Sequence, residues 1–193
     1  VTGKNYVGGI AGEANSAWSC ASGVEVSGDN SVGGIAGLIN LILADSSSNA
    51  EVNGESYVGG IAGNQNYGLV FNNVNYGNVN GDDTVGGITG FSRQSGKIYN
   101  NLNYGDISGN INVGGITGLC SIESVMDDPT TVANCINLGT VSSDNPESAG
   151  SICGYNECSV INNYWLYDPD KGLGMEIGVN DADGAFSDSY PLT

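Results

Sequence analysis

The sequence predicts an all-β protein, a right-handed parallel β-helix (β-solenoid) of about six coils. A six-residue glycine box recurs every 25 to 36 residues. Short segments between the boxes alternate apolar and polar residues with the period of a strand. No long apolar pattern has the 3.6-residue period of a helix, and 32 glycines in 193 residues argue further against helices.

The glycine box is clearest at Val58–Gly63, which reads VGGIAG. Two other copies are identical to it, two change a single residue and a sixth is decayed. The remaining five copies are residues 7–12, 32–37, 85–90, 113–118 and 149–154. A period of 20 to 50 residues indicates a repeat array in which each unit contacts only its neighbours.

An apolar anchor precedes each box. The anchors are Val1, Val26, Val52, Val79, Ile107 and Val141. From anchor to box the distance is six residues in five cases and eight in the last, whereas from box to next anchor it grows from 19 through 20, 21 and 22 to 28. One side of the repeat is therefore rigid, and the insertions are expected to bulge out on a single edge.

Asparagine-rich segments lie just before the anchors, most clearly at Asn73–Gly77 and Asn101–Gly105. Val74 and Tyr76 share one face of such a strand, and the asparagines share the other. Weaker copies of the segment are residues 20–23, 46–49, 135–139 and 163–166.

Corners are predicted where two apolar residues lie three apart with glycine between them. Tyr76 and Val79 form one such pair, and Val58 and Ile61 form the other. Glycine takes positive φ at little cost, so a corner at each place would turn all four side chains inward.

Stacked coils would bring identical residues together in ladders. We expect valine and isoleucine ladders inside, asparagine amides bonded to the copies above and below, and Tyr76 stacked on Tyr104. Coils about 4.8 Å apart would make a rod on the order of 29 Å long.

The charge is one-sided, with four basic residues, 21 acidic residues and no histidine, for a net charge of −17. Such a surface repels polyanions, which argues against nucleic acid and anionic membranes as partners. No stretch approaches the roughly 20 apolar residues of a membrane span, so no membrane insertion is predicted. The polar, acidic composition suits a secreted or wall-attached protein, although solubility alone would explain it too.

Residue 1 falls in the middle of a repeat, since Val1–Gly3 matches Val26–Gly28. We therefore expect the chain to be a piece of a longer protein with other domains. The missing targeting signals then carry no information.

Five cysteines cannot all pair within one chain. Cys20 and Cys135 occupy the same repeat position in distant turns and should not meet. Cys120, Cys153 and Cys158 lie in adjacent turns, where one bridge can form. We favour the alternative that the cysteines are buried free thiols that act as small apolar fillers.

The box with its following residue (Gly37-Leu38, Gly118-Leu119) and the Asn-x-Asn-x-Gly segment resembles the GLUG-motif repeat family. The resemblance covers residues 1–166, as a repeat solenoid. It implies a secreted or cell-surface bacterial protein, adhesin-like, and the ending Asn162–Leu166 is similar to the close of such arrays in surface proteins of gut Firmicutes. Residues 167–193 contain no box and are expected to form an irregular C-terminal cap or a linker to a following module.

Catalysis by the familiar histidine-dependent sites is excluded for this chain, because HExxH and Ser-His-Asp sets both need histidine. Glycoside hydrolysis needs two nearby carboxylates. Asp82-Asp83 precedes a box and is interpreted as a solvated turn. Asp127-Asp128 lies in the longest insertion and remains a candidate, with Arg93 and Lys97 in the neighbouring coil's insertion.

No cofactor is predicted, and calcium is the one ligand that the sequence leaves open. Asn180–Gly184 is rich in oxygen ligands, but EF-hand spacing would place Val179 at the first position. A looser calcium site would use Asp181 and Asp183.

Aromatic side chains often bind sugars and peptides. Trp18, Phe71 and Tyr99 occupy equivalent places at the end of the variable insertion. We favour a structural stack for them, but any binding edge would also lie here, together with Asp127 and Asp128, because loops that vary often carry function.

These observations predict a non-catalytic adhesin or stalk segment that displays a binding edge for a host surface protein or a glycan. A polysaccharide-degrading β-helical enzyme is the main alternative, and it requires a groove lined by carboxylates. A pure spacer is the second alternative, and it requires no ligand at all.

Overall fold

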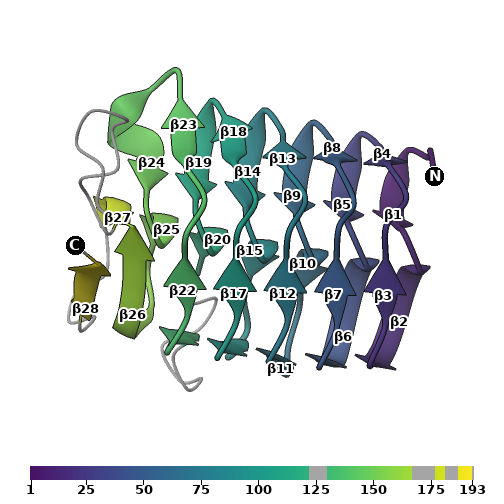
Figure 1. Cartoon of the computed structure of the whole chain (residues 1–193), viewed down its shortest axis with the longest axis horizontal. Coiled ribbons are helices and arrows are strands. Elements are labelled where there is room, and N and C mark those ends of the chain that lie inside the picture. The colour runs from purple at the N-terminus through teal and green to yellow at the C-terminus, as the bar shows by residue number, and fades with distance from the viewer. Residues whose placement is uncertain (122–129, 167–176, 181–186, 193) are drawn as a thin grey trace.

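A computed structural model of the chain describes residues 1–121, 130–166, 177–180 and 187–192. These residues form the predicted all-β parallel solenoid of about six coils, and Figure 1 shows the coils side by side along the long axis. We number the coils from their anchors, so that coils 1 to 6 begin at residues 1, 26, 52, 79, 107 and 141. The single helical element among the described residues is a short 3-10 turn, η1 (Pro146–Ser148).

Three parallel sheets run along the rod. The six-stranded sheet holds β1 (Asn5–Gly8), β5 (Asn30–Gly33), β9 (Ser56–Gly59), β14 (Asp83–Gly86), β19 (Ile111–Gly114) and β24 (Ala149–Gly150). The five-stranded sheet holds β4 (Val26–Ser27), β8 (Val52–Asn53), β13 (Val79–Asn80), β18 (Ile107–Gly109) and β23 (Val141–Ser143).

The third sheet has 17 strands and curls around the rest of each coil. After the box come β2 (Ala11–Trp18), β6 (Ala36–Ala44), β10 (Ala62–Gln65), β15 (Thr89–Ser92), β20 (Thr117–Cys120), β25 (Cys153–Asn156) and β27 (Ile177–Asn180). The next strands are β11 (Leu69–Phe71), β16 (Lys97–Tyr99), β21 (Thr131–Ala133), β26 (Ser159–Leu166) and β28 (Ser187–Leu192). The asparagine segments form β3 (Ala21–Ser22), β7 (Ser47–Ser48), β12 (Val74–Asn75), β17 (Leu102–Asn103) and β22 (Ile136–Asn137).

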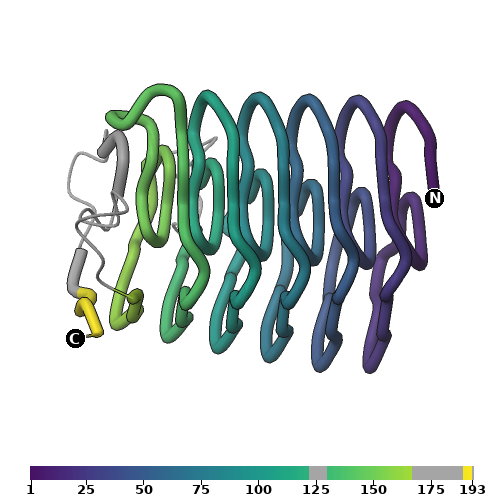
Figure 2. Tube along the Cα trace, turned by 45° about the horizontal axis from the view of Figure 1, so that its top comes forward, coloured from purple at the N-terminus to yellow at the C-terminus, as the bar shows by residue number. Residues whose placement is uncertain are grey.

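The strands pair in the register that the repeat predicts. Val58 lies opposite Val85, and Gly59 lies opposite Gly86. The tube in Figure 2 therefore repeats almost the same outline from coil to coil. The register explains the identical letters, because each box residue has its own copy as neighbour on both sides.

Two apolar cores fill each coil. A valine-rich core lies between the five- and six-stranded sheets and includes Val52, Val58 and Val79, all fully buried. The second core lies inside the 17-stranded sheet and includes the box isoleucines, such as Ile61 and Ile88. The predicted interior ladders of valine and isoleucine are confirmed.

The box glycines are needed for close packing and not for positive φ, which corrects the sequence prediction. A Cβ on Gly60 would overlap the carbonyl oxygen of Gly87, and a Cβ on Gly90 would lie 2.6 Å from the backbone nitrogen of Val58. Gly90 thus touches only backbone, whereas Gly60 lies against both the backbone and the side-chain amide of the buried Asn75. Among the described glycines, only Gly68 has positive φ.

Non-glycine residues make the left-handed corners instead. One column comes directly before the box valine, and the other comes before the buried position of the asparagine segment. The columns are Tyr6, Ser31, Tyr57, Thr84 and Asn112, and Ser19, Asp45, Asn72, Asn100, Asn134 and Asn162, with φ from 51° to 61°. Left-handed φ costs an L-residue roughly 1 kcal/mol or more, and asparagine and aspartate tolerate it best. This preference accounts for the many asparagines at the second corner.

The two faces of the asparagine strand are the reverse of the prediction. Val58, Ile61 and Val79 point inward as expected, but Tyr76 is 52% exposed, and Asn73 and Asn75 are fully buried. A buried amide is acceptable only when it is hydrogen-bonded. Stacking meets that condition for the amide nitrogens of Asn75 and Asn103, which period-two alternation alone could not reveal.

The predicted asparagine ladders are confirmed, with the amides inside the rod. Asn75 Nδ2 donates to Asn103 Oδ1 at 2.8 Å, and Asn103 Nδ2 donates to Asn137 Oδ1 at 2.8 Å. In the second ladder, Asn101 Oδ1 accepts the backbone N–H of Asn73 at 2.9 Å. The ladders therefore link side chains and backbone of successive coils.

The parallel pairing of strands continues beyond Leu166, further along the chain than the sequence predicted. β27 pairs with β25 and β28 pairs with β26, both in parallel. Residues 167–193 thus contain the strands of a partial seventh coil, and residues 167–176, 181–186 and 193 lie outside the described residues.

We expect Gly60→Ala to lower the free energy of unfolding by about 2 to 4 kcal/mol, because its Cβ meets backbone that cannot move aside. Gly23→Ala is the matched control, since a Cβ there has nothing within 4 Å. It should change stability by less than about 1 kcal/mol. Urea unfolding followed by circular dichroism measures both, and equal stabilities would contradict the close-packing role of the box.

Asn103→Ala should cost about 2 to 4 kcal/mol, because it removes a buried link and leaves the amide of Asn75 without its acceptor. Asn49→Ala, at an exposed position of coil 2, is the control and should change stability by less than about 0.5 kcal/mol. The same unfolding assay applies. A tolerated Asn103→Ala would show that the ladder contributes little.

Candidate functional site

The insertion edge is the best candidate for a binding surface. We define it as the outer side of β2, β6, β11 and β16 with the connection at residues 66–68. Three large apolar side chains are half exposed along it: Trp18 at 49%, Leu41 at 52% and Tyr67 at 53%. They come from coils 1, 2 and 3 in turn. Leu41 lies beside the Tyr67-Gly68 segment, whereas Trp18 shares the register of Ala44 and Phe71, three residues further along the strand.

Tight backbone packing places these side chains. Gly68 has φ of +75°, and a Cβ on it would overlap the carbonyl oxygen of Leu41. The connection that carries Tyr67 therefore lies directly against Leu41 of β6. Both side chains project from well-fixed backbone.

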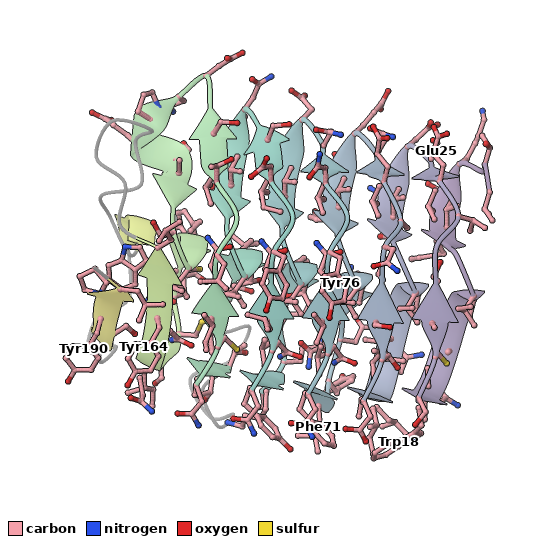
Figure 3. The ribbon with its side chains drawn as sticks, viewed as in Figure 1. Trp18, Glu25, Phe71, Tyr76, Tyr164 and Tyr190 are labelled. Carbon is pink, nitrogen blue, oxygen red and sulfur yellow. A yellow bond between two sulfur atoms is a disulfide. The ribbon has the colours of Figure 1, made fainter. Side chains whose placement is uncertain are left out.

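The predicted stack of Trp18, Phe71 and Tyr99 is confirmed. Phe71 and Tyr99 stack in parallel with centroids 5.0 Å apart, and Trp18 meets Phe71 edge-on at 5.7 Å across the small Ala44. Figure 3 shows Trp18 and Phe71 on the same edge of the rod. Stacked rings cover each other's faces, so Phe71 and Tyr99 serve mainly as structure, and Trp18 at the end of the stack is the most available ring.

A chain of polar side chains braces this edge from coil 1 to coil 4. Asn40 Nδ2 donates to Glu13 Oε1 at 3.0 Å, and Asn66 Nδ2 donates to Asn40 Oδ1 at 3.0 Å. Arg93 then donates to Asn66 Oδ1 from Nε at 2.9 Å. The chain ends on a carboxylate at one side and on a guanidinium at the other, so its amide dipoles are aligned with both charges.

The basic residues of this region are engaged in structural contacts. Arg93 also lies over the ring of Phe91, 5.5 Å from its centroid. Lys97 Nζ donates to Thr131 Oγ1 at 3.3 Å. These contacts account for both side chains without a substrate.

A second aromatic pair lies on the face of β12 and β17. Tyr76 and Tyr104 stack at 5.2 Å with 4° between their planes, as predicted, but on the outside of the rod. Figure 3 shows Tyr76 over the middle of this face. The exposed pair was missed as a surface feature because the sequence pattern placed these rings inside.

The carboxylate candidates are only partly placed by the structure. Asp82 is exposed and accepts a bond from Asn110, and Asp83 accepts from Thr84 Oγ1 at 2.8 Å, as expected of a solvated turn. The described residues bring together no group of three His, Cys, Asp or Glu side chains that could hold a metal. Asp127, Asp128, Asp181 and Asp183 lie outside the described residues.

Two of the five cysteines are bonded, so the prediction of five free thiols is wrong for this pair. A disulfide joins Cys120 of coil 5 to Cys158 of coil 6, with Cα atoms 6.0 Å apart. Cys20, Cys135 and Cys153 form no disulfide; Cys135 and Cys153 are buried, as expected of small fillers, whereas Cys20 is only partly buried. Spacing in the sequence limited the possible disulfide partners to three cysteines, and the geometry of the coils decides which two of them bond.

Cys135 replaces asparagine in the second buried ladder. Its backbone N–H donates to Asn163 Oδ1 at 2.9 Å, while its thiol lies in the apolar core. Burial raises the pKa of the Cys135 thiol from 9.0 to about 12. The thiol therefore stays protonated and unreactive at neutral pH.

This pKa predicts a loss of stability at alkaline pH. Below pH 9 the thiol is protonated in both states, whereas between pH 9 and 12 only the unfolded chain releases its proton, which favours unfolding. At pH 10.5 the cost is about 2 kcal/mol. Cys135→Asn, which restores the residue of the neighbouring coils, should lose that much less stability between pH 8 and 10.5 in urea unfolding, and parallel losses would contradict the assignment.

No helix among the described residues is long and apolar enough to cross a bilayer. Comparison with known proteins gives no match to any family model, to any curated protein or to any solved structure. The fold therefore rests on the chain's own repeat and geometry, and the GLUG resemblance stays a prediction.

Proposed function

We propose that this chain is a non-catalytic repeat segment of a bacterial surface protein, a stalk or adhesin module whose insertion edge binds a host protein or a glycan. The observation that carries the proposal is the half exposure of Trp18, Leu41 and Tyr67 on that edge. Exposed aromatic and apolar side chains on a rigid support are the usual anchors of a binding surface.

The stiffness of the rod supports the stalk role. Backbone pairing, buried amide ladders and stacked rings all connect each coil to the next. Binding to such an edge requires little ordering of the protein, which favours affinity.

An extracellular location is supported by two observations. Disulfides persist in oxidising environments, and the chain has a bond between Cys120 and Cys158. The net charge of −17 keeps such a rod soluble and separate from anionic surfaces. The glycine box and the asparagine segment also resemble the GLUG repeats of surface proteins.

The spacer alternative is favoured by one specific feature. Phe71 and Tyr99 cover each other's faces, as do Tyr76 and Tyr104, so most outer aromatic rings stabilise the rod. The enzyme alternative depends on Asp127 and Asp128, which lie outside the described residues, while Arg93 and Lys97 of the neighbouring coil's insertion already have structural partners.

A binding screen tests the proposal. The whole chain is presented to arrays of mucins, matrix proteins and host or plant glycans, with and without calcium, and soluble glycans are checked for shortening. A reproducible hit should weaken about tenfold or more in Trp18→Ala and in Tyr67→Ser. Tyr104→Ser, equally exposed on another face, should bind like the unmodified chain.

Each outcome separates the candidates. No hit across the panel would favour the spacer, and shortened glycans would favour the enzyme. A hit that Tyr104→Ser abolishes and Trp18→Ala does not would move the binding surface to the face of β12 and β17.

A further inference from the structure

The connection between anchor and box is the most regular part of the rod. In coils 1 to 4, one carbonyl of each connection accepts two successive backbone N–H groups from the next coil. The carbonyl of Lys4 accepts from Asp29 at 2.9 Å and Asn30 at 2.8 Å, and that of Asp82 accepts from Asn110 at 2.9 Å and Ile111 at 3.0 Å. This pattern leaves no room between the connections.

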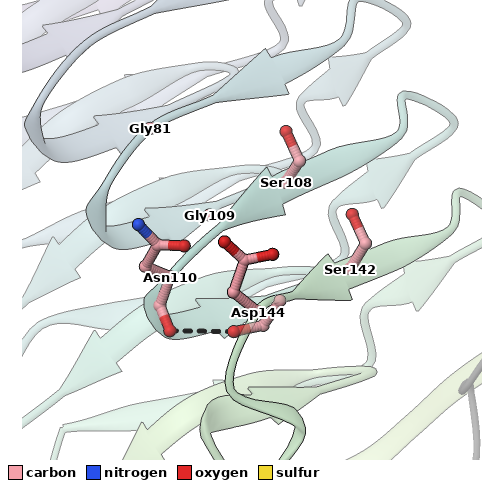
Figure 4. A pocket seen from close by; sticks show the side chains of 7 residues that line it. Gly81, Ser108, Gly109, Asn110, Ser142 and Asp144 are labelled. Atoms are coloured by element: carbon pink, nitrogen blue, oxygen red, sulfur yellow. Dashed lines mark hydrogen bonds between the residues drawn. The ribbon is translucent and has the colours of Figure 1, made fainter.

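The pattern breaks in coil 6, where the connection has two extra residues. The carbonyl of Asn110 accepts the hydroxyl of Ser143 at 2.8 Å in place of two backbone N–H groups, and the chain then turns through η1. The opening leaves a pocket of about 300 Å³. Its lining is Gly81, Ser108, Gly109, Asn110, Ser142, Ser143 and Asp144, and Figure 4 shows it from close by.

The hydroxyl hydrogens of the pocket are already used within the protein. Ser108 donates to Asn80 Oδ1 at 2.7 Å, Ser142 donates to the carbonyl of Ile107 at 3.3 Å, and the Ser143 hydroxyl donates to Asn110 as described. A hydroxyl has one hydrogen and two lone pairs, so all three offer only acceptor sites to a ligand.

Two side chains of the pocket, Asp144 and Asn110, keep unused hydrogen-bonding capacity. Asp144 is exposed, and its carboxylate has no hydrogen-bond or ion partner within the described part of the chain. Asn110 directs its amide nitrogen to the carboxylate of Asp82, which fixes the orientation of the amide because a carboxylate only accepts. One amide hydrogen of Asn110 is left to donate. The pocket thus offers many acceptors, one of them charged, and a single donor.

This inventory excludes several ligand classes. An anion would meet the carboxylate of Asp144 and the negative charge of the whole chain. A calcium ion prefers six to eight oxygen ligands with several carboxylates, and only one carboxylate lines the pocket. An apolar ligand would leave the carboxylate and the hydroxyl oxygens desolvated. A ligand with several hydroxyl groups fits, because it can donate to the carboxylate and accept from the amide of Asn110.

We propose that this pocket binds a single glycan residue through adjacent hydroxyl groups, with Asp144 as the principal acceptor and Asn110 as the donor. A volume of about 300 Å³ suits one sugar ring and lies at the lower limit of small-molecule pockets. The site is separate from the insertion edge. The pocket is argued from observations of its own. Evidence against sugar binding there would therefore not argue against binding at the insertion edge.

Titrations of the ¹⁵N-labelled whole chain test the proposal. The probes are the methyl glycosides of glucose, galactose, mannose and fucose, each added in the presence of EDTA. At least one should give saturable shifts of the Asn110 side-chain amide and of the backbone amides of Ser142 and Asp144. Asp144→Asn should weaken that binding about tenfold or more, because it removes a charged acceptor.

Asp29→Asn is the matched control, since Asp29 is exposed on the same edge in a closed connection, and it should leave binding unchanged. The proposal would be overturned if none of the four glycosides caused saturable shifts, or if Asp144→Asn bound the glycoside as tightly as the unmodified chain. Shifts of the same amides with calcium chloride alone, and none with sugars, would replace the glycan with a cation. Sugar-induced shifts confined to the backbone around Leu41 and Tyr67 would support the proposed function and would contradict binding in this pocket.

Discussion

Direct contact between backbone segments at the glycine box is the constraint on which the rest of the fold depends. The strand after each box packs directly on the backbone before the preceding box, without side chains between them, as at Gly63 and Gly90. The contact divides every coil into two compartments, one filled by valines and the other by isoleucines. Because backbone cannot yield to an added Cβ, this contact also fixes the register between coils, and every ladder follows from it.

The buried asparagines show how a narrow rod can contain polar groups at low cost. Asn75 and Asn103 donate to the amide of the next coil, Asn101 and Asn163 donate to carbonyls of the preceding coil, and some amides also accept backbone N–H groups near the left-handed corners. A single unpaired amide in this core would be costly. Repetition removes that cost at every position except the ends of each ladder, and Cys135 shows that a small apolar residue can also fill a gap in it.

Functional surfaces are expected where the repetition fails. The insertion edge is one such place, because the lengths of its turns vary and apolar side chains project from them. The connection of coil 6 is the other, because its two extra residues interrupt the backbone hydrogen-bond pattern of the earlier connections beside a pocket. Where the repeat is regular, many side chains contact the equivalent side chains of the neighbouring coils and are not available to a ligand. The disulfide between Cys120 and Cys158 lies in the same irregular part of the rod and holds coils 5 and 6 together.

The sequence by itself determined the architecture, since a box repeated in register can be satisfied only by stacking. It also determined the ladders, the aromatic stack and the edge that receives insertions, because spacing in the chain becomes position around the coil. The tertiary structure decided which face of the asparagine strand points inward: alternation shows that two faces differ, but only the ladder bonds make the polar face the buried one. It likewise decided that the glycines serve contact, that Cys120 bonds Cys158 rather than Cys153, and that coil 6 opens a pocket. Each of these depends on distances between neighbouring coils, which no single repeat encodes.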